Sequence, residues 1–337
     1  MTEIIQTNPG RSDFHLFADF PKNIYPADSL RFKTPESIPE DCLETCYLLA
    51  DEGEIVARAS IYNNPLLEYK GQHALTVGNY ECKNHADNAH KLLTHIKLKA
   101  KSFDAKYLIG PMNGSTWESY RFGISDENPL FFTESCHHIY YNQHFLSAGF
   151  EPVASYFSNI DRSMKYDNPE ILKREREFKD QHVTIRSIDL SHFEEEIERI
   201  YDFNTIAFKT NFLYTPINKH AFVKKYIQSK KYINPDFTLL AEDVNQNLIG
   251  YYFCVHDFFN INEKSLIVKT LARHPDPQWS GLGHVIGNVI YRRAVALGYT
   301  SAIHPFVYQQ GTSTKLSANF SGVNYKNYIL YGLKLAE

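Results

Sequence analysis

Residues 273–283 read RHPDPQWSGLG, and this stretch joins a strand-like run to a helix-like run. Residues 265–271 before it have the composition of a buried strand, and apolar residues recur at helical spacing over residues 286–297. Gly281 and Gly283 allow main-chain amides to point into a concavity at the helix N-terminus, where such amides attract phosphate oxygens. The stretch therefore predicts a diphosphate site, and a tight turn without a ligand is the alternative.

Several other kinds of site are excluded by pattern. The chain has no G-x-x-x-x-G-K-[ST] motif, and the dinucleotide pattern G-x-G-x-x-G is incomplete because Ile286 occupies its last position. No H-E-x-x-H, C-x-x-C or G-x-S-x-G pattern occurs either. We therefore expect no metal site and no serine hydrolase chemistry.

The helix and the strand that follow this turn occur twice in the chain. Residues 91–111 align without a gap with residues 285–305, and the match lies in the apolar pattern more than in identities. Gly298 stands where a left-handed residue would end the second helix. Each copy is expected to contain a three-stranded meander, a helix, a strand and an aromatic tail. The meander strands are expected at residues 46–50, 55–62, 73–81, 237–241, 248–255 and 265–271.

The length of 337 residues agrees with two domains of about 150 residues each. In the second domain, Ser191 and Glu194 fit a capping box for a first helix, and a second helix is expected to begin at Thr215. The expected parts are an N-terminal domain at residues 1–165, a charged, solvated helical connector at residues 166–182, and a C-terminal domain at residues 183–337.

The turn also resembles a known cofactor motif. Residues 278–283, QWSGLG, resemble the Q/R-x-x-G-x-G/A motif of the GNAT superfamily of N-acetyltransferases, and residues 271–275 resemble the end of its fourth strand. Residues 141–151 are similar to the closing Y-x-x-x-x-x-x-x-G-F-E segment of that superfamily. Residues 110–113, GPMN, resemble a segment of its tandem members. The resemblance spans about residues 15–162 and 183–335.

This resemblance implies an α/β (α+β) fold with two tandem GNAT-like domains, each a twisted, mostly antiparallel sheet flanked by helices. In the first copy the positions that match the motif are residues 84–89, NHADNA, which contain no glycine. Asp87 adds a carboxylate there that would repel a diphosphate. The N-terminal domain is therefore expected to have a degenerate cofactor loop and to supply scaffold or acceptor pocket. The acyl-CoA site is expected in the C-terminal domain.

Acetyl-CoA, or another acyl-CoA, is the co-substrate that the resemblance implies. Main-chain amides of residues 279–283 would hold its diphosphate, and the backbone of Leu271 and Arg273 would pair with the pantetheine arm like an added strand. Ser313 and Ser317 would contact CoA from the last helix, and a simple helix cap at Ser313 is the alternative. The implied cofactor-binding residues are Leu271, Arg273, Gln278, Trp279, Ser280, Gly281, Leu282, Gly283 and Ser313.

A tyrosine that protonates the leaving CoA thiolate from the last helix is also implied. Residues 325–331 offer three tyrosines, and Tyr331 is the predicted catalytic residue because it precedes Gly332. A packed ring is the alternative, since the chain has 23 tyrosines. The attacking amine must be neutral, so a general base or a water chain is required. The candidates for that base, at predicted strand ends, are Glu242, His256, Asp257 and His274.

The sequence thus predicts an N-acyltransferase that moves an acetyl or other short acyl group from CoA to an amine of a small molecule or peptide. A non-catalytic acyl-CoA-binding module and a tRNA-dependent aminoacyl transferase stay open as alternatives. The net charge of −4 does not favour nucleic acid as a partner. Five scattered cysteines and the lack of long apolar runs predict a cytoplasmic protein without a membrane partner. A homodimer is left open.

Overall fold

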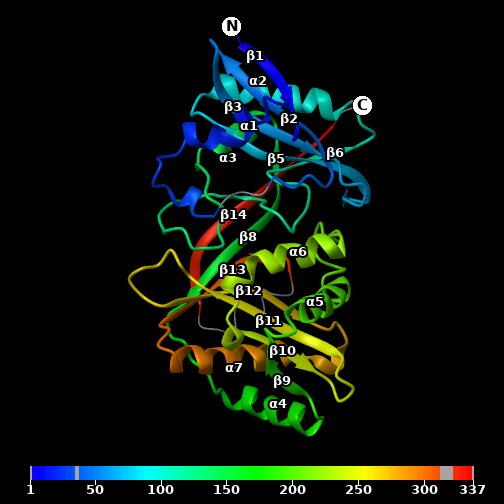
Figure 1. Ribbon diagram of the computed structural model, residues 1–337, viewed down its shortest axis with the longest axis vertical. Coiled ribbons are helices and arrows are strands. Elements are labelled where there is room, and N and C mark those ends of the chain that lie inside the picture. The colour runs from blue at the N-terminus through cyan, green and yellow to red at the C-terminus, as the bar shows by residue number, and fades with distance from the viewer. Residues whose placement is uncertain (1, 35–37, 312–321, 336–337) are drawn as a thin grey trace.

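The computed structural model of the protein describes residues 2–34, 38–311 and 322–335. The described strands form one twisted sheet that runs the length of the molecule, with helices on its faces (Figure 1). The strand order along this sheet is β1-β2-β3-β5-β6-β14-β8-β13-β12-β11-β10-β9, and most neighbours are antiparallel. The predicted mixed α/β class is therefore confirmed.

The first half of the chain builds one end of the sheet. Its strands are β1 (Thr2–Thr7), β2 (Leu43–Asp51), β3 (Glu54–Tyr62), β4 (Glu68–Tyr69), β5 (Gln72–Cys82), β6 (Tyr107–Gly110), β7 (Phe122–Gly123) and β8 (Glu151–Asp161). Its helices are α1 (Phe14–Asp19), α2 (Ala86–Ala100) and α3 (Tyr141–Ser147). Buried side chains of α2 and α3 pack against β2, β3 and β5 in one apolar core.

The second half repeats this arrangement with additional helices. Its strands are β9 (Thr184–Ser187), β10 (Thr238–Glu242), β11 (Leu248–His256), β12 (Ser265–Arg273), β13 (Ser301–Tyr308) and β14 (Val323–Lys334). Its helices are α4 (Pro169–Asp180), α5 (Phe193–Ala207), α6 (Lys219–Ser229) and α7 (Leu282–Ala296). The α7 core and the α5–α6 core bury opposite faces of these strands, so the sheet is covered on both sides here.

The duplicated helix and strand are confirmed in both halves. α2 leads into β6, which pairs in parallel with β5, and α7 leads into β13, which pairs in parallel with β12. A crossover helix is what a parallel neighbour requires. Both parallel pairs are short, because they cover only Ala74–Thr76 in the first half and Ser265–Ile267 in the second. Beyond these residues each pair of strands diverges.

The closing strands are exchanged between the halves. β14, the last strand of the chain, lies between β6 and β8, and β8 lies between β14 and β13. Each half of the sheet is therefore completed by a strand from the other half of the chain (Figure 1). The exchange also corrects a prediction, since residues 325–331 lie on a strand and not on a last helix.

Two local predictions were wrong in detail. His192 is the N-cap of α5 without a side-chain bond, and the Ser191 hydroxyl donates to Asp189, so no capping box forms. The next helix begins at Lys219, not at Thr215, because the Asn218 side chain caps it by accepting from the Ala221 amide.

The predicted connector is helical but is not simply solvated. In α4, Phe178 is only 1% exposed and packs in the core beneath α7. The connector therefore belongs to the C-terminal half of the sheet. In the described ranges, no helix is long and apolar enough to cross a bilayer.

Candidate functional site

The turn between β12 and α7 uses some of its main-chain amides internally. The Gln278 amide donates to the Asp276 carboxylate, the Trp279 amide to the Asp276 carbonyl, and the Ser280 amide to the Pro277 carbonyl. These three bonds close a short 3-10 turn, Pro277–Trp279, ahead of the helix. Of the amides predicted to hold a diphosphate, those of Trp279 and Ser280 are therefore already bonded.

Three further amides of the turn are free. In the described part of the chain, the amides of Gly281, Leu282 and Gly283 have no hydrogen-bond partner. They belong to the N-cap and the first two positions of α7, where the helix leaves its donors unpaired and its dipole is positive. Gly281 has φ +89°, a left-handed conformation that favours glycine. The turn therefore presents three adjacent N–H groups at the helix end.

The outer side of this turn is held by Arg174 of α4. Its guanidinium donates to the carbonyls of Ser280 (2.9 Å) and Gln278 (2.8 Å) and lies 4.0 Å from the centroid of the Phe178 ring. A Cβ atom added at Gly281 would lie 3.2 Å from the Arg174 Cγ. The connector helix thus fixes the turn and places a positive charge beside it.

Among the described strands, β12 has no partner along one edge next to this turn. Its parallel pairing with β13 ends at Ile267. The His274 amide bonds to the Ile249 carbonyl of β11, and hydrogen-bonding direction alternates along an antiparallel strand. The amides and carbonyls of Leu271 and Arg273 therefore face the gap between β12 and β13. The pairing of these two residues with an extended ligand arm stays a prediction.

A β-bulge interrupts β12 where the gap opens. Val268 lies opposite Cys254 and Thr270 opposite Phe253, so Lys269 is the extra residue. A bulge leaves that residue outside the regular ladder and redirects its side chain, and bulges are common beside active sites. The main chain of Lys269 is therefore available to a ligand lying along the gap.

The corresponding gap in the first half is filled by the chain itself. The Met112 amide donates to the Val77 carbonyl, and the Asn79 amide donates to the Asn113 side chain. A Cβ atom added at Gly78 would collide with Asn113, so the two segments are in close contact. The edge of β5 is thus occupied between β5 and β6. The degenerate cofactor loop of this half stays a prediction.

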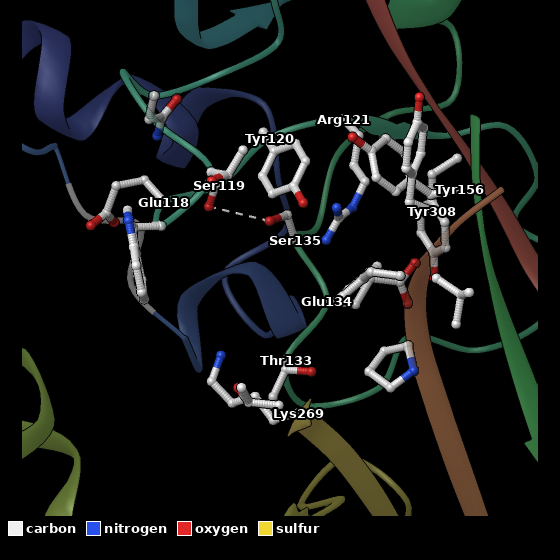
Figure 2. Close-up of a pocket in the computed structure, with 18 of the residues that line it drawn as sticks. Glu118, Ser119, Tyr120, Arg121, Thr133, Glu134, Ser135, Tyr156, Lys269 and Tyr308 are labelled. Carbon is white, nitrogen blue, oxygen red and sulfur yellow. Dashed lines mark hydrogen bonds between the residues drawn. The ribbon is translucent and has the colours of Figure 1, made fainter. Parts of the chain in front are cut away.

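A large cavity lies between the two halves. Its volume is about 1110 Å³, and residues 268–271 of β12 form part of its wall. Other walls come from the segment 116–122, from residues 132–137 and from α6, so both halves contribute (Figure 2). Much of the lining is aromatic. The aromatic lining residues include Trp117, Tyr120, Phe132, Tyr156, Phe208, Tyr214, Phe222, Tyr226, Phe306 and Tyr308.

Two acidic residues of the cavity wall, Glu118 and Glu134, form ion pairs. Lys225 of α6 contacts Glu118 at 2.7 Å, and Lys326 of β14 contacts Glu134 at 2.8 Å. The second pair is almost fully buried, with side-chain exposures of 6% and 3%. Burial raises the pKa of Glu134, although Lys326 opposes that shift. Both pairs join elements from different halves of the chain.

Lys269 enters the cavity from the bulge. Its side chain is exposed to the cavity, and in the described ranges it has no hydrogen-bond or ion-pair partner. Desolvation by the surrounding walls lowers the pKa of Lys269 to about 8, and the charges of Lys225 and Arg121 add to the effect. Sequence reasoning missed this residue, although a lysine inside the apolar run 265–271 was a signal that could have identified it.

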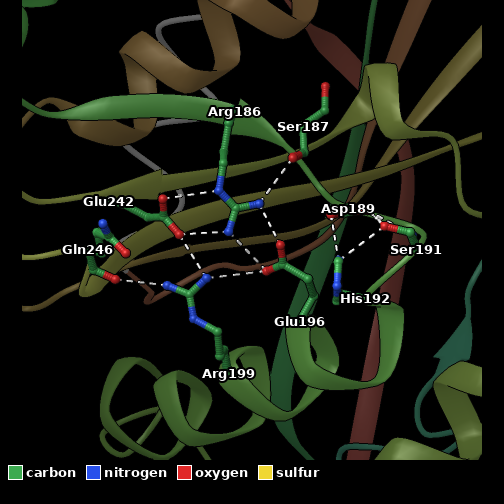
Figure 3. Close-up of polar contacts among 9 residues, drawn as sticks. All are labelled: Arg186, Ser187, Asp189, Ser191, His192, Glu196, Arg199, Glu242 and Gln246. Atoms are coloured by element: carbon green, nitrogen blue, oxygen red, sulfur yellow. Dashed lines mark hydrogen bonds and ion pairs between the residues drawn. The ribbon is translucent and has the colours of Figure 1, made fainter.

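None of the four predicted bases lines this cavity. Figure 3 shows Glu242 of β10 in an ion network with Arg186 of β9 and Arg199 of α5. Burial alone would raise the pKa of Glu242, but these guanidinium groups hold it below its usual value.

The other three candidates also make local contacts. Asp257 accepts from the Phe132 amide, and the His274 ring accepts from the Asp276 amide. His256 packs edge-on against Phe258. The base role of all four residues stays a prediction without geometric support from the cavity.

Tyr331 lies in the N-terminal half because β14 is an exchanged strand. It sits opposite Gly110 of β6, is 2% exposed, and donates its hydroxyl to Asn142 at 2.8 Å. The structure does not bring it together with the turn at Gly281. Ser313, predicted to bind CoA, and Ser317 lie outside the described residues.

No protein-family model and no curated protein matches the sequence. Solved structures do match. A GCN5-related glucosamine N-acetyltransferase region of a fungal multi-domain β-N-acetylglucosaminidase aligns with 99% of this chain at 13% identity and a TM-score of 0.59. The match covers 38% of the fungal chain, so this protein spans about two fifths of it.

Two further matches cover almost all of both chains. A tandem GNAT protein from the clavulanic acid biosynthesis pathway aligns over 100% of this chain and 99% of its own, with 8% identity and a TM-score of 0.54. A GCN5-related N-acetyltransferase from Sphaerobacter thermophilus aligns over 99% and 96%, with 13% identity and a TM-score of 0.51. At such identities the likeness concerns the fold, and it confirms the tandem GNAT architecture predicted from the sequence.

Proposed function

We propose that this chain, which has the tandem GNAT fold, is an N-acyltransferase that moves an acetyl or other short acyl group from CoA to an amine. The observation that carries the proposal is the combination in the C-terminal half of three free amides at residues 281–283 with an open β12 edge. The first half has the same elements but a filled edge and no glycine in its loop. One acyl-CoA site per chain is therefore expected.

An acyl-CoA would lie along this edge in a defined direction. The free amides of Gly281, Leu282 and Gly283 would bind its diphosphate, helped by the positive end of α7. The main chain of Leu271 and Arg273 would hydrogen-bond to the amides of the pantetheine arm in the manner of an added strand. This direction places the thioester near the bulge at Lys269, where β12 enters the cavity.

The chemical step is direct attack by the acceptor amine. The amine nitrogen bonds to the thioester carbonyl carbon, and the carbonyl oxygen gains negative charge as the carbon becomes tetrahedral. A β12 amide near the bulge would donate to that oxygen, which stabilises the developing charge. The C–S bond then breaks, CoA leaves as a thiolate, and the amine proton passes to a base or to solvent.

Isothermal titration with acetyl-CoA, paired with a thiol-release assay over a panel of amines, tests the proposal. The panel includes glucosamine, because that sugar is named for the fungal match. Saturable binding with amine-dependent thiol release is the expected result. Binding without thiol release would instead favour a non-catalytic acyl-CoA-binding module, and absence of binding would refute both functions.

A pair of glycine variants localises the site. Gly281→Ala forces a side chain into a left-handed position, pushes on Arg174 and misaligns the free amides, so acetyl-CoA affinity is expected to fall about tenfold. Gly298→Ala is the matched control, since Gly298 has φ +79° at the other end of α7 and no atom within 4 Å of the added Cβ. Equal losses of affinity in the two variants would contradict the assignment.

A further inference from the structure

We propose that the acceptor amine carries an anionic group, a carboxylate or a phosphate, and that Arg121 and Lys269 bind this group in the central cavity. The inference rests on the proposed acyl transfer, because it names the chemical class of the substrate for the same site. Figure 2 shows both residues at the cavity, Arg121 from the loop before β7 and Lys269 from β12.

The charges around the cavity leave these two cations without a carboxylate. The described lining contains three acidic side chains. Of these, Glu81 is paired with Arg31 and Arg58. Glu118 and Glu134 are paired with Lys225 and Lys326. Each acidic side chain of the described wall is therefore paired with a cation other than Arg121 or Lys269, and the described lining carries a net positive charge.

The Arg121 guanidinium is held by aromatic rings, and it makes no hydrogen bond to the described residues. Its guanidinium carbon lies 3.9 Å from the ring centroid of Tyr120, 4.0 Å from that of Phe306 and 4.8 Å from that of Tyr156. Ring faces attract the cation and fix its plane, but they accept none of its in-plane N–H groups.

The donors of Arg121 are unsatisfied in consequence. Its buried Nε and Nη1 atoms have no hydrogen-bond partner among the described residues. Buried donors of this kind are rare, and a planar guanidinium matches the two oxygens of a carboxylate or phosphate. Arg121 also has a left-handed φ of 69°, and such outliers in non-glycine residues collect at ligand-binding sites. The side chain is thus preorganised for an anion that the described residues do not supply.

The anion is not expected to be the diphosphate of CoA. The proposed diphosphate site lies at residues 281–283, beyond the end of β12. Lys269 is four residues before the end of that strand at Arg273, which corresponds to roughly 13 Å at the rise of a β-strand. Lys269 therefore lies at the thioester end of the proposed path. An anion bound there belongs to the acceptor.

The rest of the lining indicates the body of this acceptor. Around the two cations the walls are mainly aromatic, and Trp117 forms edge contacts with Phe222 and Tyr214. Flat rings favour an apolar or aromatic group. The expected acceptor class is an amine with an apolar body and one anionic substituent.

The first experiment measures binding without catalysis. The probe is 3-phenylpropionate, its neutral partner is 3-phenylpropanamide, and phenyl phosphate is the phosphate arm, each titrated into the full-length protein with saturating CoA. At least about tenfold tighter binding of one of the anions than of the amide is expected. The preferred anion then distinguishes a carboxylate from a phosphate site. Equal binding of both anions and the amide, or no binding of any, would overturn the proposal.

Variants tie the anion preference to the two residues. Arg121→Met and Lys269→Met are each expected to lose the preference while their affinity for acetyl-CoA stays within about threefold of wild type. Arg121→Lys should keep part of the preference. Arg11→Met, at an exposed surface arginine, is the matched control and should change nothing. Retention of the full preference in both methionine variants would refute the assignment. If Arg121→Met does not fold, as judged by circular dichroism, Lys269→Met alone decides the question.

Turnover then separates this inference from the function on which it rests. In wild type, kcat/KM for phenylalanine or for O-phosphotyramine is expected to exceed that for phenethylamine by at least about tenfold. In Arg121→Met this preference for the charged amines should vanish because their KM rises, while kcat stays within about threefold of the wild-type value. Anion binding without turnover of any amine would refute acyl transfer and leave the anion site standing. Equal turnover of the charged and neutral amines would refute the anion site and leave acyl transfer standing.

Discussion

Replacing Lys326 by methionine should destabilise the protein by about 3–5 kcal/mol, since the change leaves Glu134 as an unpaired buried charge. The two side chains are 6% and 3% exposed, and the Lys326 ammonium donates to both carboxylate oxygens, at 2.8 and 3.0 Å. Methionine keeps much of the aliphatic volume, so the loss reports the charge and not a cavity. Lys326 lies on the exchanged strand β14, and Glu134 lies in the first half of the chain. The variant therefore tests how much this ion pair stabilises the packing of the exchanged strand β14.

The double variant Lys326→Met/Glu134→Gln isolates the electrostatic part. Because it removes the stranded charge, it should recover at least about 2 kcal/mol relative to Lys326→Met alone. Burial already raises the pKa of Glu134 above its usual value, and removing Lys326 would raise this pKa further. A raised carboxyl pKa costs stability above the folded pKa, and the cost disappears as the pH falls below the unfolded value of about 4.3. The difference in unfolding free energy between the single and the double variant should therefore shrink as the pH is lowered from 7.5 to 4.5.

Urea unfolding followed by circular dichroism measures these differences. Lys22→Met is the control, because Lys22 forms an exposed pair with Asp19 and its loss should cost less than about 1 kcal/mol. A loss below about 1 kcal/mol in Lys326→Met would contradict the expected cost of the unpaired charge. A double variant that is no more stable than Lys326→Met would contradict it as well.

Three further predictions concern the site. Lys269→Met should be more stable than wild type at pH 7, because the fold lowers the pKa of Lys269 to about 8 and the charged form is therefore disfavoured. In thermal melts this gain in stability should fade between pH 8 and about 10.4, which is the pKa of lysine in the unfolded chain. Arg174→Met removes two bonds to the turn and should raise the acetyl-CoA dissociation constant about threefold to tenfold by calorimetry, and an unchanged value would contradict the anchoring role. Calorimetry should also give one acetyl-CoA per chain, unchanged in Asn113→Ala, whereas two sites would show that the first half binds CoA as well.

Local pattern was sufficient to predict the repeated elements. The apolar spacing of residues 286–297 and the glycines at 281 and 283 correctly predicted a helix that opens at this turn. Such features depend on neighbours within a few residues, and single sequences carry that information well.

The strand exchange could not be predicted in the same way. Residues 325–331 form part of the strand β14, but the residues of β6 and β8 with which they pair lie far away in the sequence. Pairing over such separations is not encoded in local spacing. The predicted role of Tyr331 followed from a helix that is not there, and this residue now lies in the N-terminal core.

The cavity cations were missed for a related reason. Lys269 and Arg121 become unusual only when the walls around them are assembled from both halves of the chain. Within its own segment, Arg121 is an ordinary loop residue, and its three ring contacts come from β8, β13 and its own loop. Composition showed many aromatic residues but not which of them face a ligand.

The most direct test of the account observes the main-chain amides of the turn themselves. In amide proton and nitrogen spectra of the labelled protein, saturation with acetyl-CoA should shift Gly281, Leu282 and Gly283 strongly, as their free N–H groups bond to phosphate oxygens. The amides of Trp279 and Ser280, already bonded within the turn, should shift much less. If acetyl-CoA saturates the protein and the three free amides do not move, or if it does not bind, the proposed site is wrong.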